Sequence, residues 1–296
     1  MTNAYVLHEV LPSLESPLMV VMLTGWIDAS GAAAAAMASL EQECNARTIA
    51  TFDGDMFIDY RARRPTMELR EGVNTRLVWT DIDLKVGRDA AGHDVLMLSG
   101  PEPDSQWRRF ADVASSLAVE LGVSQMIALG AYPFATPHTR PPRLSSSSPS
   151  AEVIARVPYL KNSVDVPAGM GAVLEHALND KGVPALGIWV QVPHYVSSMN
   201  YPAATVALLD GLREISGLVV EATELRHSTI IQRQRLDQLV AANDEHVGMV
   251  HQLEELYDTS TEQTLSMGAG SMGAGDLPSG DELVAELEKF LREQEG

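Results

Sequence analysis

Short apolar runs alternate with amphipathic segments, and this alternation constrains the fold more than any other feature of the sequence. The run at 18–23 is continuous and partly β-branched, as in a strand buried on both faces of a sheet. A glycine-bounded turn, 25–31, leads into an alanine-rich segment at 32–44, and a second strand follows at 48–53. Strand, helix and strand in succession predict a βαβ unit, which builds a parallel sheet by a right-handed crossover.

The same alternation continues to about residue 218. We expect Ser30 to cap the first helix, because serine is a favoured N-cap residue. The further expected elements are strands at 94–99, 125–130 and 186–192, helices at 107–121, 170–179 and 202–215, and a strand or hairpin arm at 76–86 closed by a turn at 89–92. The pattern predicts an α/β fold, a three-layer α/β/α sandwich over residues 1–218.

The remaining residues read as an appendage in three parts. Residues 219–260 predict one long acidic helix with an apolar stripe, which either packs on its own domain or pairs with another subunit. Residues 261–280 contain a direct repeat of Ser-Met-Gly-Ala-Gly and predict a flexible linker. Residues 281–296 predict a short amphipathic helix that needs a docking surface. Its expected partner-binding residues are Leu283, Leu287, Phe290 and Leu291.

Charge and cysteine content narrow the class of protein. The net charge is −19, and residues 237–296 hold fourteen acidic residues against two basic ones, a net of −12. This balance disfavours nucleic-acid binding and leaves two interpretations open, solubility or a basic partner. Cys44 is the single cysteine, so we expect a buried, inert thiol and a reducing compartment. With neither a secretory pattern at residues 1–5 nor an apolar stretch of roughly 20 residues, a soluble, cytoplasmic protein is expected.

Polar and aromatic residues follow the predicted strands, where ligands bind in α/β sheets. Those expected to line a pocket are Trp26, Asp28, Asp53, Glu102, His138, Arg140, His194 and Tyr195. The alternative is that they cap helices and pair with one another, for example Asp53 or Glu102 with Arg140. No phosphate-binding motif or GxSxG elbow is present, and the histidines lack metal-ligand spacing, so we expect neither cofactor nor metal.

A set of motifs in a fixed order then identifies a resemblance. The set comprises Gly25-Trp26-Ile27-Asp28-Ala29, Asp53 with Phe57, Asp59, Arg64 and Pro65, Gly100-Pro101-Glu102-Pro103-Asp104 with Trp107, Pro137-His138-Thr139-Arg140-Pro141, and Trp189 with Val192-Pro193-His194-Tyr195 and Pro202-Ala203. It resembles the proteasome assembly chaperone 2 family, in its bacterial, actinobacterial type, over about residues 18–218.

The resemblance implies a phosphorylase/hydrolase-like fold and a family whose eukaryotic members are chaperones of proteasome α-ring assembly. It also implies homo- or hetero-oligomers. Relatives that dock into α-ring pockets end in a hydrophobic residue, a tyrosine and any residue, whereas this sequence ends Gln294-Glu295-Gly296. Docking by the C-terminus is therefore not expected.

Three functional hypotheses follow. The first is a non-catalytic binding or assembly factor that acts through protein–protein contacts as a homo-oligomer, with a trimer as the working prediction. The second is a nucleoside phosphorylase- or hydrolase-like enzyme that uses a pocket at the carboxyl edge of the sheet. The third is a sensor that binds a small molecule in the same pocket.

Overall fold

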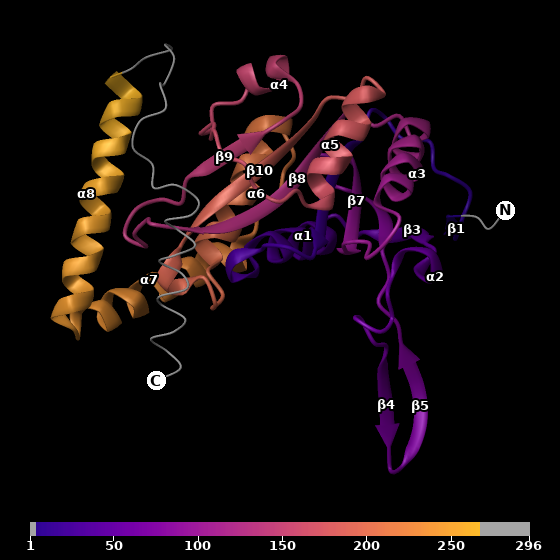
Figure 1. Cartoon of the computed structure of the whole chain (residues 1–296), viewed down its shortest axis with the longest axis horizontal. Coiled ribbons are helices and arrows are strands. Elements are labelled where there is room, and N and C mark those ends of the chain that lie inside the picture. The colour runs from indigo at the N-terminus through magenta and orange to yellow at the C-terminus, as the bar shows by residue number, and fades with distance from the viewer. Residues whose placement is uncertain (1–3, 267–296) are drawn as a thin grey trace.

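One mixed sheet of eight strands organises the chain (Figure 1), in a computed structural model that describes residues 4–266. In spatial order the strands are β1 (Tyr5–Leu7), β3 (Arg47–Phe52), β6 (Asp83–Arg88), β7 (Asp94–Pro101), β2 (Leu18–Thr24), β8 (Gln125–Phe134), β10 (Ala185–Pro193) and β9 (Leu144–Ser147). β7, β2, β8 and β10 are parallel neighbours. β9, β6 and β1 are antiparallel to the strands they pair with.

The expected βαβ unit over 18–53 is wrong in its pairing. β3 runs in the same direction as β2, but β6 and β7 lie between them, and β3 pairs antiparallel with β6. The reason is local: β6 and β7 form a hairpin across the turn at 89–92, and β7 takes the place beside β2. Alternation along the chain gives the succession of strands and does not determine their neighbours.

Helices cover both faces of the sheet, which confirms the three-layer α/β/α fold. The helices of the body are α1 (Ala32–Glu43), α2 (Gly54–Phe57), α3 (Trp107–Glu120), α4 (Ala151–Ala155), α5 (Met170–Asp180) and α6 (Pro202–Ser216), with short 3₁₀ turns η1 (Ala29–Gly31) and η2 (His194–Val196). In β2, Val20 and Met22 belong to the core beneath α1 and α6, whereas Met19 and Val21 belong to the core beneath α3 and α5. The strand is buried on both faces, as its continuous apolar run predicts.

A two-stranded hairpin, β4 (Thr66–Arg70) and β5 (Val73–Val78), extends away from the main sheet (Figure 1). The arm expected over 76–86 is wrong in its extent, because its first residues end β5 and its last residues begin β6, whereas the expected turn at 89–92 does close a hairpin, between β6 and β7. Residues 79–82 separate the two strands without the glycine or proline that would signal a break in the sequence.

Residues 219–260 form two helices, so the prediction of one long helix is wrong. α7 (Thr223–Ala241) and α8 (Asp244–Ser266) meet at Ala242 and Asn243. The helix breaks here because Asn243 is the N-cap of α8: its side chain accepts the backbone N–H of Glu245 at 2.9 Å. Of the two interpretations left open for this segment, packing on its own domain applies, since Leu236 of α7 and Val250 of α8 are buried.

Several expectations fall on the end of the chain. α8 continues to Ser266, so the range predicted as a linker, 261–280, begins inside a helix. The rest of that range and the predicted terminal helix, 281–296, lie outside the described residues, as do Leu283, Leu287, Phe290 and Leu291. Between residues 4 and 266, none of the helices combines the length and the hydropathy that crossing a membrane requires.

Candidate functional site

The carboxyl ends of five strands, β2, β3, β7, β8 and β10, lie along one edge of the sheet because these strands run in the same direction. Each residue predicted to line a pocket follows one of them. The structure separates these residues into carboxylates that cap helices and a polar cluster beyond β8 and β10.

Asp28 caps α1 directly after β2. Its two carboxylate oxygens accept the backbone N–H groups of Ala33 and Ala34 at 2.8 and 3.0 Å. Burial raises the pKa of Asp28, and the two amide bonds oppose that rise. The expected N-cap, Ser30, is wrong: its backbone is left-handed, with a φ of 60°, and within residues 4–266 its buried hydroxyl has no hydrogen-bond partner. An ionised carboxylate that reaches two amides is the stronger acceptor there.

Glu102, after β7, is held between two loops. One carboxylate oxygen accepts the backbone N–H of Met170 at 2.5 Å, at the first residue of α5. The other lies so close to Gly25 that a Cβ on that glycine would stand 2.2 Å from it. Glycine at position 25 is therefore what lets this buried carboxylate reach the helix.

Asp53, after β3, makes a third contact of the same kind. Its Oδ1 accepts the backbone N–H of Asp55 at 3.0 Å in α2. The predicted pairing of Asp53 or Glu102 with Arg140 is therefore wrong, because both carboxylates are engaged by backbone amides. Helix N-termini are ready sites for phosphate and other anions. Here the chain places its own carboxylates on them.

Trp26 and His194 lie at the surface of the same edge. Trp26 is 46% exposed. His194 is exposed on η2, and its ring meets Tyr195 edge-on, with ring centroids 5.3 Å apart. Neither side chain lines the cavity described below.

His138 connects the loop after β8 to η2 and to α7. Its side chain is only 1% exposed. The Tyr195 hydroxyl accepts the backbone N–H of His138 at 2.7 Å and lies 2.7 Å from Nδ1 of the ring. Because that oxygen already accepts the amide, its own proton is available to Nδ1. Nε2 then carries the ring proton and donates to Asp237 at 3.2 Å.

The protonation states of this network follow from its burial. Burial lowers the pKa of His138, and Asp237 opposes the shift. Burial also raises the pKa of Tyr195 to about 12. Both side chains are therefore neutral near pH 7, and both ring nitrogens of His138 are engaged. This arrangement joins two parts of the fold and leaves no free ring nitrogen to act as a base.

Arg140 ties the β8–β9 loop (135–143) to α8. Its guanidinium donates to both carboxylate oxygens of Asp258, at 2.9 and 2.7 Å, and to Glu254 at 3.1 Å. The hydrogen bonds to Asp258 hold the pKa of Arg140 above its ordinary value, and the guanidinium lowers the pKa of Asp258. Thr139 also donates to Glu254, at 2.5 Å.

Arg143 and Tyr257 add a second set of contacts between the same loop and α8. The Arg143 guanidinium donates to the Tyr257 carbonyl at 2.6 Å and stands over the tyrosine ring, 3.6 Å from its centroid. The Tyr257 hydroxyl donates to the carbonyl of Pro141 at 3.0 Å. Residues 139–143 of the β8–β9 loop therefore contact α8 through several hydrogen bonds.

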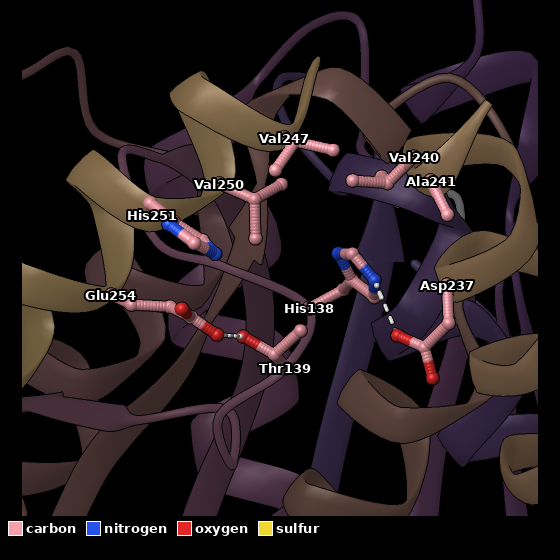
Figure 2. Close-up of a pocket in the computed structure, with 9 residues that line it drawn as sticks. All are labelled: His138, Thr139, Asp237, Val240, Ala241, Val247, Val250, His251 and Glu254. Carbon is pink, nitrogen blue, oxygen red and sulfur yellow. Dashed lines mark hydrogen bonds and ion pairs between the residues drawn. The ribbon is translucent and has the colours of Figure 1, made fainter. Parts of the chain in front are cut away.

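A cavity of about 170 Å³ remains between this loop and the two helices (Figure 2). The lining residues are His138, Thr139, Asp237, Val240, Ala241, Val247, Val250, His251 and Glu254. Of the eight residues predicted to line a pocket, only His138 does so. Arg140 and Tyr195 do not line the cavity but contact the lining residues Glu254 and His138. The other five lie elsewhere along the edge.

Sequence reasoning missed the residues that α7 and α8 contribute. Asp237, Glu254 and Asp258 are about a hundred residues away in the chain from the loop they contact. Nothing in the acidic stripe distinguishes these three from the solvated acids beside them. The one available signal was Asn243 followed by two acidic residues, which is an N-cap pattern and marks the turn that brings α8 back over the loop.

Two other predictions concern reactive groups. Cys44 is buried, and burial, with Asp89 and Glu43 nearby, raises the pKa of its thiol to about 12, which fits the expected inert cysteine. Over the described part of the chain, no group of three or more His, Cys, Asp or Glu side chains is placed to hold a metal ion.

Comparisons with known proteins give a family and several solved relatives. A family model described as the PAC2 family matches residues 22–240. A protein of unknown function from Corynebacterium glutamicum is 32% identical with a TM-score of 0.82, and the match covers 88% of this chain and 99% of that one. Comparison with curated proteins finds no match.

Two further structures carry descriptions. A PAC2 family protein from Streptomyces avermitilis is 33% identical with a TM-score of 0.72. A Mycobacterium tuberculosis protein described as a proteasome-assembly chaperone homologue is 30% identical with a TM-score of 0.73. Each match covers 79% of this chain and 99% of the other.

Proposed function

This chain belongs to the PAC2 family, and from that premise we propose that it is a non-catalytic binding or assembly factor that acts through protein–protein contacts as a homo-oligomer in the cytoplasm. The family match is the observation that carries the proposal. The similar M. tuberculosis protein is described as a proteasome-assembly chaperone homologue, which supports an assembly-type role for this chain.

The hairpin β4–β5 supports self-association. A two-stranded hairpin is at best marginally stable alone in water, and exposed apolar patches mark interaction surfaces. Every residue of β5 is exposed, and Met67, Leu69 and Val73 are 52%, 51% and 62% exposed. Such an arm gains stability when a second chain covers it.

The charge of the hairpin region also supports self-association. Residues 61–80 contain five arginines and two glutamates, a net of +3, whereas the whole chain has a net charge of −19. A basic apolar arm fits an acidic surface, and a second copy of this chain offers one. We propose a trimer, in which each arm contacts a neighbouring subunit.

The capping carboxylates argue against the phosphorylase-like alternative. A phosphorylase must bind phosphate, and Asp28, Asp53 and Glu102 occupy the amides at three helix N-termini of the carboxyl edge. A phosphate there would have to displace a carboxylate that already accepts these amides. The sensor alternative rests on the cavity beside His138, whose ligand is considered below.

Partner binding is proposed for the end of the chain. Leu283, Leu287, Phe290 and Leu291 recur at spacings that place apolar residues on one face of a helix. An amphipathic helix of this kind binds partner proteins by laying its apolar face into a groove.

The test is recovery of partners from gently prepared native lysate, with the full-length chain as bait. We expect Leu287→Ser with Phe290→Ser to lose the proteins that the unmodified chain enriches, and Ala285→Ser, which lies off the apolar stripe, to retain them. Equal enrichment by all three baits, or no enrichment by the unmodified chain, would contradict partner binding through this segment. The mass of each bait in solution distinguishes loss of a partner from loss of self-association.

A further inference from the structure

The cavity beside His138 has a size that suits one class of ligand. Its volume of about 170 Å³ is comparable to the engineered cavity of about 150 Å³ that binds benzene. It therefore accommodates a molecule of about six non-hydrogen atoms. Val240 and Ala241 of α7 and Val247 and Val250 of α8 form one wall (Figure 2), which favours an apolar body.

The other wall carries two carboxylates. Asp237 uses one oxygen to accept from His138, and Glu254 uses one oxygen to accept from Thr139 and Arg140. Over residues 4–260, whose side chains the structure describes, neither remaining oxygen has a hydrogen bond or ion pair. Each carboxylate therefore has an acceptor oxygen left for a ligand.

The nearest cations neutralise this wall only in part, since Arg140 pairs with Glu254. The residues that line the cavity include no lysine or arginine. Arg140 is shared between Glu254 and Asp258, and Arg233 donates to the carbonyl of Thr139. Burial lowers the pKa of His138, so its ring is neutral near pH 7 and the charge of Asp237 is not cancelled.

From this geometry we propose that the cavity binds a small primary alkylammonium compound. The ammonium group donates to the unengaged oxygen of Glu254, the alkyl chain packs against the valines, and Asp237 adds its negative charge from the other side of His138 (Figure 2). An alkyl carboxylate of the same length is repelled by both acids. An alcohol has one donor and no positive charge, so it lacks the attraction between the ammonium and the two carboxylates. The site lies on α7 and α8, apart from the hairpin on which self-association is proposed (Figure 1).

The first test titrates pentylammonium chloride into the unmodified full chain by calorimetry, with pentanol and sodium pentanoate as matched probes at constant ionic strength. We expect saturable binding of pentylammonium, and binding of the other two weaker by about tenfold or more. Binding of pentanoate as tight as that of pentylammonium, or no saturable binding of pentylammonium, would overturn the proposal.

The second test locates the site. Ala241→Phe fills the cavity, and Asp237→Asn removes its charge while keeping an acceptor for His138. Each is expected to weaken pentylammonium binding by about tenfold or more. Glu255→Gln removes an exposed acid of α8 that does not line the cavity and is expected to leave affinity unchanged. Unchanged affinity in both cavity variants, with thermal midpoints like the parent, would overturn the assignment.

Discussion

Glu175 of α5 carries a carboxyl group in an unfavourable position for a charge. The residue is 4% exposed, and its one side-chain hydrogen bond within the described residues is a long one, 3.5 Å, from the Ser147 hydroxyl. A Cβ on Gly187 would lie 2.7 Å from one of its oxygens, so the carboxyl packs directly on the sheet. Burial raises the pKa of Glu175 from 4.5 to about 8.

This carboxyl makes the stability of the fold depend on pH. Between about pH 4.5 and 8 the folded state holds a proton that the unfolded state has lost, so the free energy of unfolding falls as pH rises, by up to about 1.4 kcal/mol per pH unit. Glu175→Gln removes the proton linkage. We predict that denaturant unfolding gives similar stabilities for variant and parent near pH 5, and a more stable variant near pH 8. Parallel curves for the two proteins across this range would contradict the prediction.

Gly25 and Glu102 give a second prediction at the residue scale. In Gly25→Ala, the new Cβ would displace the carboxylate that accepts the Met170 amide, and a buried amide would lose its partner. We predict a loss of about 1–3 kcal/mol in the free energy of unfolding. Glu102→Ala should make the glycine substitution nearly harmless, because the obstructing group is gone. Additive effects of the two substitutions in a double-mutant cycle would argue against this contact.

At the residue scale, the sequence predicts at which edge of the sheet a side chain lies but not which group it hydrogen-bonds to. Asp28, Asp53, Glu102 and His138 all lie at the predicted edge, because strand direction fixes that edge. Their partners are backbone amides and a distant helix, which no local pattern specifies. Arg140 illustrates the difficulty, since its carboxylate partners lie on α8 rather than beside it in the loops.

At the scale of elements, the β8–β9 loop and the pair α7–α8 act as one unit. Arg140 and its two carboxylates are partly exposed, so salt should weaken their attraction. We predict that Arg140→Gln raises amide hydrogen exchange in α8 several-fold and leaves exchange in β2 and β8 unchanged. Arg226→Gln is the matched control, because Arg226 pairs with Asp210 on α6 instead. Equal exchange in α8 for the two variants would show that Arg140 does not hold this helix.

Elements were predictable where burial imposes a periodic pattern. β2 has a continuous apolar run because both of its faces are buried, and α3 and α6 end close to the predicted residues. The hairpin β4–β5 and the break at Asn243 were missed for a physical reason. Neither lies in the core, so no hydrophobic period marks it.

At the scale of the whole molecule, the three-layer fold followed from the alternation of elements, whereas the order of strands did not. The hydrogen bond between Thr139 and Glu254 joins residues that are far apart in the chain. Both side chains are polar, so the sequence alone predicts that they face solvent. The apolar arm at β4–β5 is instead exposed, and this exposure is the basis of the proposed self-association.

The most direct test of the proposed function is the mass of the purified protein by light scattering. We predict a multiple of the 32.0 kDa chain mass, three times that mass for the proposed trimer. Leu69→Ser with Val73→Ser should reduce the mass to that of one chain. Leu239→Ser alters an apolar residue on α7 that is similarly exposed, at 64%, and should leave the mass unchanged. A parent protein with the mass of a single chain, or a hairpin variant that keeps the parent mass, would contradict self-association through the hairpin.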